Sequence, residues 1–177
     1  VVVSTVMLNI FGQNGVLSNI LTHFGLEDFS IYQQVKQWPV VMVGIRLWKQ
    51  TGYGTVVYLA AIAGLSQEMF EAASIDGANG WQKFRHITVP LVSPVTFYIL
   101  ITSLIGGFQV FVEVQVMTNK GGTNYSAATV VYYLYDKAFS NGQLGYGCAL
   151  AVILAIIIFI ITALNFAGQD RWVKTMD

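Results

Sequence analysis

Charged residues are scarce in this chain of 177 residues, where lysine, arginine, aspartate and glutamate together make up 10%. A soluble globular domain carries about 25%, so the composition disfavours a water-soluble fold. The nine basic and nine acidic residues cancel to a net charge of zero. This removes the positive field on which nucleic-acid binders depend. We therefore expect neither a soluble enzyme nor a nucleic-acid-binding protein.

Residues that form disulfides or bind metals are equally few. Cys148 has no second cysteine with which to form an internal disulfide, and His23 and His86 lack the spacing of metal ligands. No phosphate-binding Gly-x-x-x-x-Gly-Lys-Ser/Thr sequence occurs, and no nucleophile–base–acid arrangement can be read. The sequence predicts no catalytic residue, no metal site and no cofactor, and we do not expect this chain itself to hydrolyse ATP.

Apolar residues are abundant, at 55% of the chain with a mean hydropathy of +0.60. The clearest apolar run covers residues 146–167, where only Thr162 and Asn165 near its end interrupt it with polar side chains. A helix of that length spans roughly 30 Å, the thickness of the hydrocarbon core of a bilayer. Further runs lie at residues 40–65 and 91–113, and residues 1–11 look like the end of another. These runs predict an all-α, polytopic transmembrane helix bundle.

Basic residues give the expected orientation of the bundle. Residues 66–90 and the tail 168–177 lie two spans apart and therefore on the same side, and they hold Lys83, Arg85, Arg171 and Lys174. The opposite side holds Lys36, Lys120 and Lys137. Because basic residues favour the cytoplasmic side, we expect residues 66–90 and 168–177 to be cytoplasmic and residues 114–145 to be extracytoplasmic.

The segment of residues 66–90 is longer than a connection between two spans requires. Ser66 can cap a short helix whose positive N-terminal end lies near Glu68 and Glu71. The sequence Gly-Ala-Asn-Gly at 77–80 then predicts a turn, and residues 81–86 predict a second short helix.

The polar face of the first short helix is acidic, with Glu68, Glu71 and Asp76. Helices that lie on a lipid surface usually have a basic polar face. The acidic face favours a protein partner on the cytoplasmic side, and the alternative is an ordinary interfacial helix that joins two spans.

The spacing of residues 71–90 resembles the EAA loop of the membrane subunits of ABC importers. Glu-Ala-Ala at 71–73 is followed at the motif's spacing by Gly77, Ile87 and Pro90, and Val89 replaces the usual leucine. The stretch 71–78 is most similar to the carbohydrate-uptake branch, the maltose-permease-like subunits. Other segments of the chain agree with that branch, although Thr123 stands where it usually has proline.

This resemblance implies a type I ABC importer permease, of which the chain is the C-terminal part. Residues 66–90 are then a coupling loop that docks on a dimer of separate ABC ATPase subunits. The implied coupling residues are Glu71, Ala72, Ala73, Asp76, Gly77, Ala78, Ile87 and Pro90. Further implied partners are a second homologous permease subunit, an extracytoplasmic solute-binding protein and a sugar or oligosaccharide. The implied location is the bacterial cytoplasmic (inner) membrane.

Polar side chains within the predicted spans are candidates for the solute path, because such residues are costly in a bilayer and often functional. The candidates are Arg46, Lys49, Ser103, Gln109 and Glu113. Arg46 and Lys49 either face a wet cavity or extend to the outer interface. Glu113 either lines the cavity or marks that interface.

Ser103 shares a helix face with Thr96 and Gly107, a pattern that close helix packing explains as well as a solute path does. The adjacent Gly106 and Gly107 are also a place where the helix can break, as helices of transporters often do.

Residues 114–145 are rich in tyrosine and suit contact with a soluble solute-binding protein, or an interfacial helix at 127–139, or both. Two rival functions stay open at this point. One is an ABC permease for a non-sugar or anionic solute, and the other is a secondary transporter with its coupling ion near Glu113.

Overall fold

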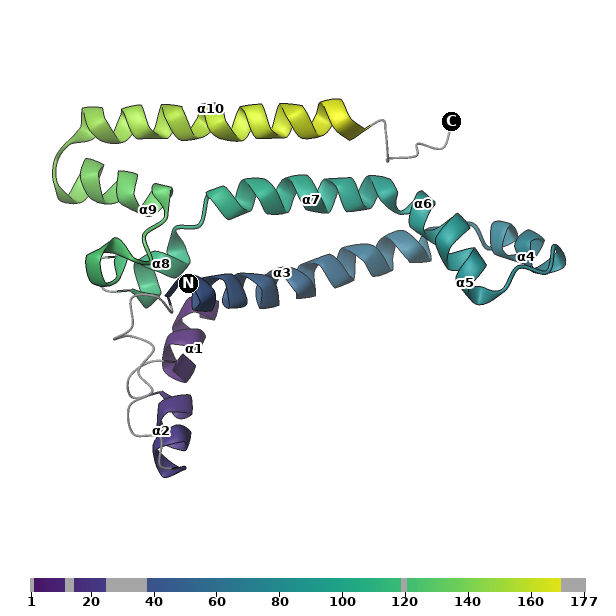
Figure 1. Cartoon of the computed structure of the whole chain (residues 1–177), viewed down its shortest axis with the longest axis horizontal. Coiled ribbons are helices and arrows are strands. Elements are labelled where there is room, and N and C mark those ends of the chain that lie inside the picture. The colour runs from purple at the N-terminus through teal and green to yellow at the C-terminus, as the bar shows by residue number, and fades with distance from the viewer. Residues whose placement is uncertain (1, 12–14, 25–37, 119–120, 170–177) are drawn as a thin grey trace. The chain divides into compact units, whose positions relative to one another are not determined.

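The computed structural model describes residues 2–11, 15–24, 38–118 and 121–169, and within these ranges it contains helices and no strand (Figure 1). The longer helices are α1 Val2–Phe11, α2 Val16–His23, α3 Trp38–Ala63, α4 Gln67–Ile75, α7 Ser93–Phe108 and α10 Leu144–Gly168. The shorter ones are α5 Gly80–Lys83, α6 Val89–Leu91, α8 Val112–Met117, α9 Val130–Tyr135, the 3-10 turn η3 Thr123–Tyr125 and the π-helical turns η1 Phe84–Thr88 and η4 Asp136–Ser140. The expected all-α fold is confirmed.

Contacts divide the chain into two compact units. Unit 1 comprises Val1–Trp48 and Gly106–Ile158, and unit 2 comprises Lys49–Ile105 and Phe159–Asp177. Helices α3, α7 and α10 each contribute residues to both units.

The core of unit 1 is small. Helix α1 packs on α8, and the buried cluster at its centre is made of Met7, Ile45, Met117 and Ala127. Many large apolar side chains lie outside this cluster and are exposed. For example, Val2 has 76% and Val40 has 72% of its surface accessible. A water-soluble domain buries most such groups, whereas a bilayer accommodates them.

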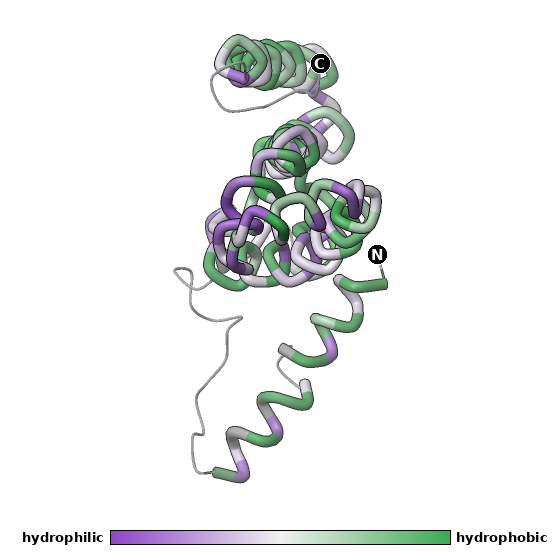
Figure 2. Tube along the Cα trace, turned by 90° about the vertical axis from the view of Figure 1, so that its right-hand side faces the viewer, coloured by the Kyte–Doolittle hydropathy of each residue, from purple (hydrophilic) through white to green (hydrophobic). Residues whose placement is uncertain are grey.

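Helix α10 is the clearest membrane-spanning candidate. Its 25 residues include an 18-residue window of mean hydropathy 3.0, of which only 6% is buried within the chain. Figure 2 shows most of this helix in the hydrophobic colour. The one amide near its end is satisfied locally, because Asn165 donates to the carbonyl of Ile161 at 2.8 Å. Within the described residues, it is the single unbent helix long and apolar enough to cross a bilayer.

Helix α3 has 26 residues, but Arg46, Lys49 and Gln50 lie near its middle, and it does not reach the same apolar standard. That it spans the membrane stays a prediction. In unit 2 its side chains are hydrogen-bonded to α7: Gln50 donates to Ser103 at 2.8 Å, and further along Tyr58 donates to Thr96 at 3.0 Å. These bonds make a polar seam between two helices.

The predicted span at 91–113 begins beside a bend, contains all of α7 and reaches the first residues of α8, and that it crosses the membrane stays a prediction. The stretches Gly80–Leu91 and Ser93–Phe108 meet at a bend of 57°, and together they would form a second span. Pro94 explains the bend, because it has no N–H to donate to the carbonyl of Pro90, four residues earlier. The hydroxyl of Ser93 donates to that carbonyl instead, at 2.7 Å.

Two predicted boundaries differ from the structure. The helix does not break at Gly106 and Gly107, since α7 continues to Phe108 and the break follows it. The interfacial helix expected at 127–139 begins at Val130 because Thr129 caps it. The Thr129 hydroxyl accepts from the N–H of Tyr132 at 3.2 Å.

Candidate functional site

The first helix of the 66–90 loop ends in a well-defined cap. Gly77 has a φ of +76°, in the left-handed region that favours glycine. The N–H of Ala78 donates to the carbonyl of Ala73 at 2.9 Å, and the N–H of Gly77 donates to that of Ser74 at 3.1 Å. This pair of bonds is the Schellman motif, so Gly77 reverses the chain and satisfies the last carbonyls of α4.

The second helix of the loop begins with a reciprocal cap. The side chain of Asn79 accepts from the N–H of Gln82 at 2.9 Å, and the Gln82 side chain accepts from the N–H of Asn79 at 2.8 Å. Lys83 donates to the hydroxyl of Ser74 at 2.5 Å and so ties the second helix to the first. By contrast, Ser66 occupies the N-cap position of α4 but makes no side-chain capping bond.

The loop holds its shape without a core. Neither α4 nor α5 has a buried residue, and large apolar side chains face outward, among them Ile75 at 88% and Trp81 at 68% exposed. The rings of Trp81 and Phe84 lie 5.6 Å apart. Figure 2 looks onto this end of unit 2 and shows hydrophilic and hydrophobic residues interspersed along it. Exposed apolar groups next to carboxylates are typical of a docking surface for protein.

The structure places the predicted coupling residues on this surface or at its base. Glu71, Ala72, Asp76 and Gly77 are exposed, whereas Ala73, Ala78, Ile87 and Pro90 are half-buried. One carboxylate oxygen of Glu71 accepts from the Gln67 side chain at 2.8 Å. Their role in coupling stays a prediction.

The predicted path residues do not form one cluster. Arg46, Gln109 and Glu113 belong to unit 1, and Lys49 and Ser103 belong to unit 2. Ser103 lies in the α3–α7 seam as a hydrogen-bond acceptor. Gln109 and Lys49 are exposed, and Glu113 is buried, with 8% of its surface accessible.

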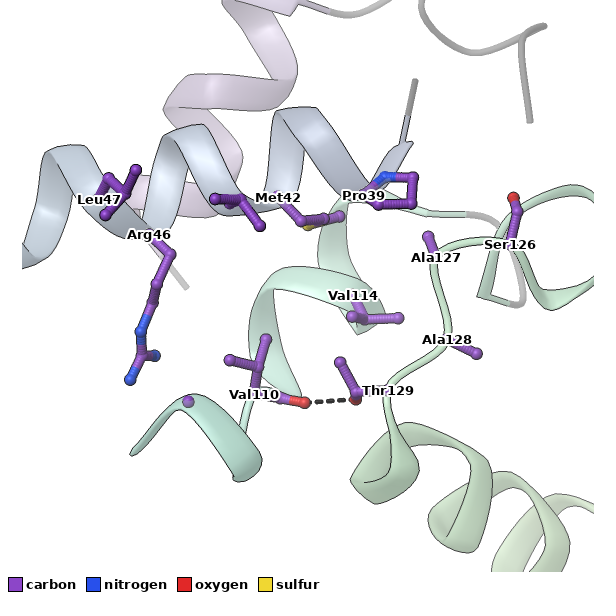
Figure 3. A pocket seen from close by; sticks show the side chains of 12 residues that line it. Pro39, Met42, Arg46, Leu47, Val110, Val114, Ser126, Ala127, Ala128 and Thr129 are labelled. Carbon is purple, nitrogen blue, oxygen red and sulfur yellow. Dashed lines mark hydrogen bonds between the residues drawn. The ribbon is translucent and has the colours of Figure 1, made fainter. Parts of the chain in front are cut away.

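Arg46 lies in a pocket of unit 1 of about 430 Å³, which Figure 3 shows. The wall is largely apolar, with residues such as Met42 and Val114. The Thr129 hydroxyl donates to the carbonyl of Val110 at 2.5 Å, so that it links the irregular backbone after α7 to the segment just before α9 (Figure 3). Arg46 is the one charged residue among those that line this pocket in the described part of the chain.

Gly106 makes room for Arg46. A Cβ atom at Gly106 would lie 2.5 Å from Nη2 of Arg46, whereas one at Gly107 would meet nothing within 4 Å. The sequence indicates only that the glycine pair permits a helix break or close packing, and it does not reveal this contact because residues 46 and 106 lie far apart in the chain.

A second pocket of unit 1, of about 510 Å³, lies within residues 115–141 and is lined mainly by polar and aromatic side chains. Of its lining residues, Tyr132 and Tyr135 stand out in the sequence only as part of a tyrosine-rich segment.

The expected orientation of the chain also depends on Lys36, Lys120, Arg171 and Lys174, which lie outside the described residues, as does most of the tail 168–177.

Comparison with known proteins gives consistent likenesses. The family described as "Binding-protein-dependent transport system inner membrane component" matches residues 1–173. The arabinooligosaccharides transport system permease protein AraP of Bacillus subtilis is 33% identical over 158 residues, which cover 88% of this chain and 50% of AraP. The diacetylchitobiose uptake system permease protein NgcF of Streptomyces coelicolor is 34% identical, over 94% of this chain and 48% of NgcF. The chain therefore spans about half the length of these relatives.

A solved structure supports the fold. A chain of a bacterial ABC transporter involved in the import of the acidic polysaccharide alginate superposes with a TM-score of 0.82, at 24% identity, covering 98% of this chain and 61% of the other. At that identity the likeness concerns the fold, and it agrees with the helix bundle of an ABC importer permease.

Proposed function

Because this chain belongs to the family of binding-protein-dependent transport system inner membrane components, we propose that it forms part of the membrane-spanning subunit of an ATP-driven importer. The proposed cargo is a sugar or an oligosaccharide. Its support is the identity of 33–34% to permeases whose names specify arabinooligosaccharides and diacetylchitobiose.

In this proposal the 66–90 loop couples the permease to a dimer of ATPase subunits, which carry out the hydrolysis of ATP. The support is a loop whose two short helices are capped and tied together but bury none of their own side chains. The ATPase subunits bias the permease between two states only if they contact the loop differently in each. Glu71 meets a basic residue of the ATPase, and Gly77 sets the turn that presents the first helix.

The chain then crosses the bacterial cytoplasmic membrane several times, with α3, the bent pair that ends in α7, and α10 as spans. Residues 66–90 lie in the cytoplasm, and residues 114–145 lie outside. A second homologous permease subunit and an extracytoplasmic solute-binding protein complete the importer. Arg46, Lys49, Ser103, Gln109 and Glu113 are the proposed path residues.

The proposal is tested with the full-length permease reconstituted with its ATPase, second permease and solute-binding protein in proteoliposomes. Uptake and ATP hydrolysis are measured with arabinotriose, lactose, N,N′-diacetylchitobiose and, as an anionic solute, sn-glycerol 3-phosphate. We expect at least one saccharide to stimulate hydrolysis and to be taken up only with ATP. Uptake of glycerol phosphate alone, or uptake driven by an ion gradient without ATP, contradicts the proposal.

Glu71→Lys tests the coupling role. Reversal of a buried interface charge typically costs at least the 2–5 kcal/mol of its truncation, so we expect loss of uptake with normal membrane insertion. Glu68→Lys is the matched control, because Glu68 makes the same charge change on the same exposed helix, one turn earlier. Equal loss in both variants contradicts a specific role for Glu71.

A further inference from the structure

The polar pocket within residues 115–141 has no part in the coupling loop or in the proposed path residues. It has a volume of about 510 Å³, inside the range of about 300–1,000 Å³ that small-molecule sites occupy. All its lining residues belong to unit 1. Its chemistry therefore indicates what it can bind.

The lining offers hydrogen-bond donors and acceptors together. Gln115 and Asn141 supply amides, which both donate and accept, and Asp136 supplies a carboxylate. The Asn141 amide lies 3.4 Å from the carboxylate, and the hydroxyl of Tyr125 donates to the same oxygen at 3.1 Å. That hydrogen bond and the negative charge of Asp136 raise the pKa of Tyr125 above its ordinary value.

Aromatic rings form the remaining wall. Tyr135 lies with its ring centre 4.9 Å from that of Phe111 and 5.1 Å from that of Phe139. Tyr132 is buried, with its ring centre 6.3 Å from that of Phe111. These contacts hold Tyr135 in place. Flat aromatic faces beside polar groups suit the C–H faces and the hydroxyl groups of a sugar ring.

The turn that presents Tyr125 is strained. Tyr125 has a φ of +57° and its neighbour Asn124 a φ of +54°. A non-glycine residue in the left-handed region is strained by its Cβ atom, and such strain gathers at functional sites. The bond from Tyr125 to Asp136 is one of the contacts that hold it.

The charge of the lining argues against a metal ion. Asp136 is its one charged group, and the described part of the chain has no group of three or more histidine, cysteine, aspartate or glutamate residues that could hold a cation. A lone carboxylate among amides, hydroxyls and aromatic rings matches a neutral polyhydroxylated ligand.

We infer that this pocket is a saccharide subsite, in which one sugar ring packs on Tyr135 and bonds through its hydroxyl groups to Gln115, Asp136 and Asn141. The inference rests on the proposed function and deepens it. It gives residues 114–145 a role in receiving the cargo, in addition to any contact with the solute-binding protein.

The test uses the complete importer in proteoliposomes with radiolabelled arabinotriose, lactose and N,N′-diacetylchitobiose. Removing both amides, with Gln115→Ala and Asn141→Ala together, takes away two of the proposed hydrogen bonds to the sugar. We expect the KM of uptake to rise about tenfold on that basis, with ATP-dependent coupling retained. Gln143→Ala is the matched control, because Gln143 is exposed on the same segment and outside the pocket.

Gln115→Ala alone removes one amide of the pocket from an exposed position of α8, so it answers the question if the double variant fails to insert. We expect a KM about threefold higher, the effect of one hydrogen bond. If the KM of uptake is unchanged in a variant that inserts, the inference that this pocket is a saccharide subsite is wrong. The proposed function survives that result if Glu71→Lys still abolishes saccharide uptake, whereas both fall if none of the three saccharides is taken up.

Discussion

Replacement of Gly77 tests whether the turn of the 66–90 loop transmits force in the proposed coupling to the ATPase. The N–H groups of Gly77 and Ala78 close the Schellman motif on Ser74 and Ala73, at 3.1 Å and 2.9 Å. A side chain at φ +76° is strained even though a Cβ there meets nothing within 4 Å. The cost is therefore conformational and not steric, at about 1–2 kcal/mol for an ordinary residue.

The substitutions Gly77→Asn, Gly77→Ala and Gly77→Val form a graded series. Asparagine tolerates the left-handed region best, and a β-branched residue tolerates it least. A cost of about 1.4 kcal/mol is a tenfold change in population, so we expect uptake to fall by about tenfold in Gly77→Val and least in Gly77→Asn. ATP hydrolysis without uptake would accompany the loss.

The assay is uptake per ATP hydrolysed in proteoliposomes, with insertion checked by the yield of purified complex. Gly80→Ala is the control, because Gly80 begins helix α5 and a Cβ there also meets nothing within 4 Å. Gly80→Ala should behave as wild type. The reasoning is refuted if Gly77→Val couples normally, or if the three variants lose activity without the expected order.

Three further predictions follow from single contacts. Gly147→Ala should destabilise the permease by about 1–3 kcal/mol through overpacking, since its Cβ would lie 2.6 Å from that of Ala138. The control is Gly145→Ala, whose Cβ would meet nothing within 4 Å and which should leave the stability unchanged. Both are measured by thermal unfolding in detergent. Gln50→Leu should cost about 0.6 kcal/mol, the average of hydrogen bonds between membrane helices, and a double-mutant cycle with Ser103→Ala should show coupling in the same unfolding assay. Asn79→Ala should cost about 1 kcal/mol of helix stability, seen as faster amide hydrogen exchange in α5, and unchanged exchange contradicts the capping role.

Local patterns were sufficient where the physics is local. The two short helices of the 66–90 loop follow from a glycine at a helix end and from Asn79 three residues before Gln82, and both features act within a few residues. The apolar run of α10 likewise predicts its own helix. The expected family membership is confirmed by the match over residues 1–173.

Competition between neighbouring signals explains the errors in boundaries. Pro90 directly precedes the predicted span at 91–113, yet Pro94 decides where the bend falls, because its missing N–H leaves the carbonyl of Pro90 to Ser93. Gly106 and Gly107 permit a break without requiring one, so α7 continues through both.

Features that depend on distant contacts were beyond the sequence. The approach of Arg46 to Gly106 joins residues far apart in the chain. The pocket that brings Gln115 near Asp136 depends on how the chain returns between α8 and α9. The local sequence around these residues does not predict either of these contacts.

If the 66–90 loop has the proposed coupling role, the absence of buried side chains in α4 and α5 has a consequence for repeated cycles of transport. Backbone and polar side-chain hydrogen bonds within the loop determine its shape, so the loop is preorganised before it binds. Little conformational entropy is then lost on each engagement. In the proposed importer, an ATPase subunit would therefore release and bind this loop many times without the loop having to refold.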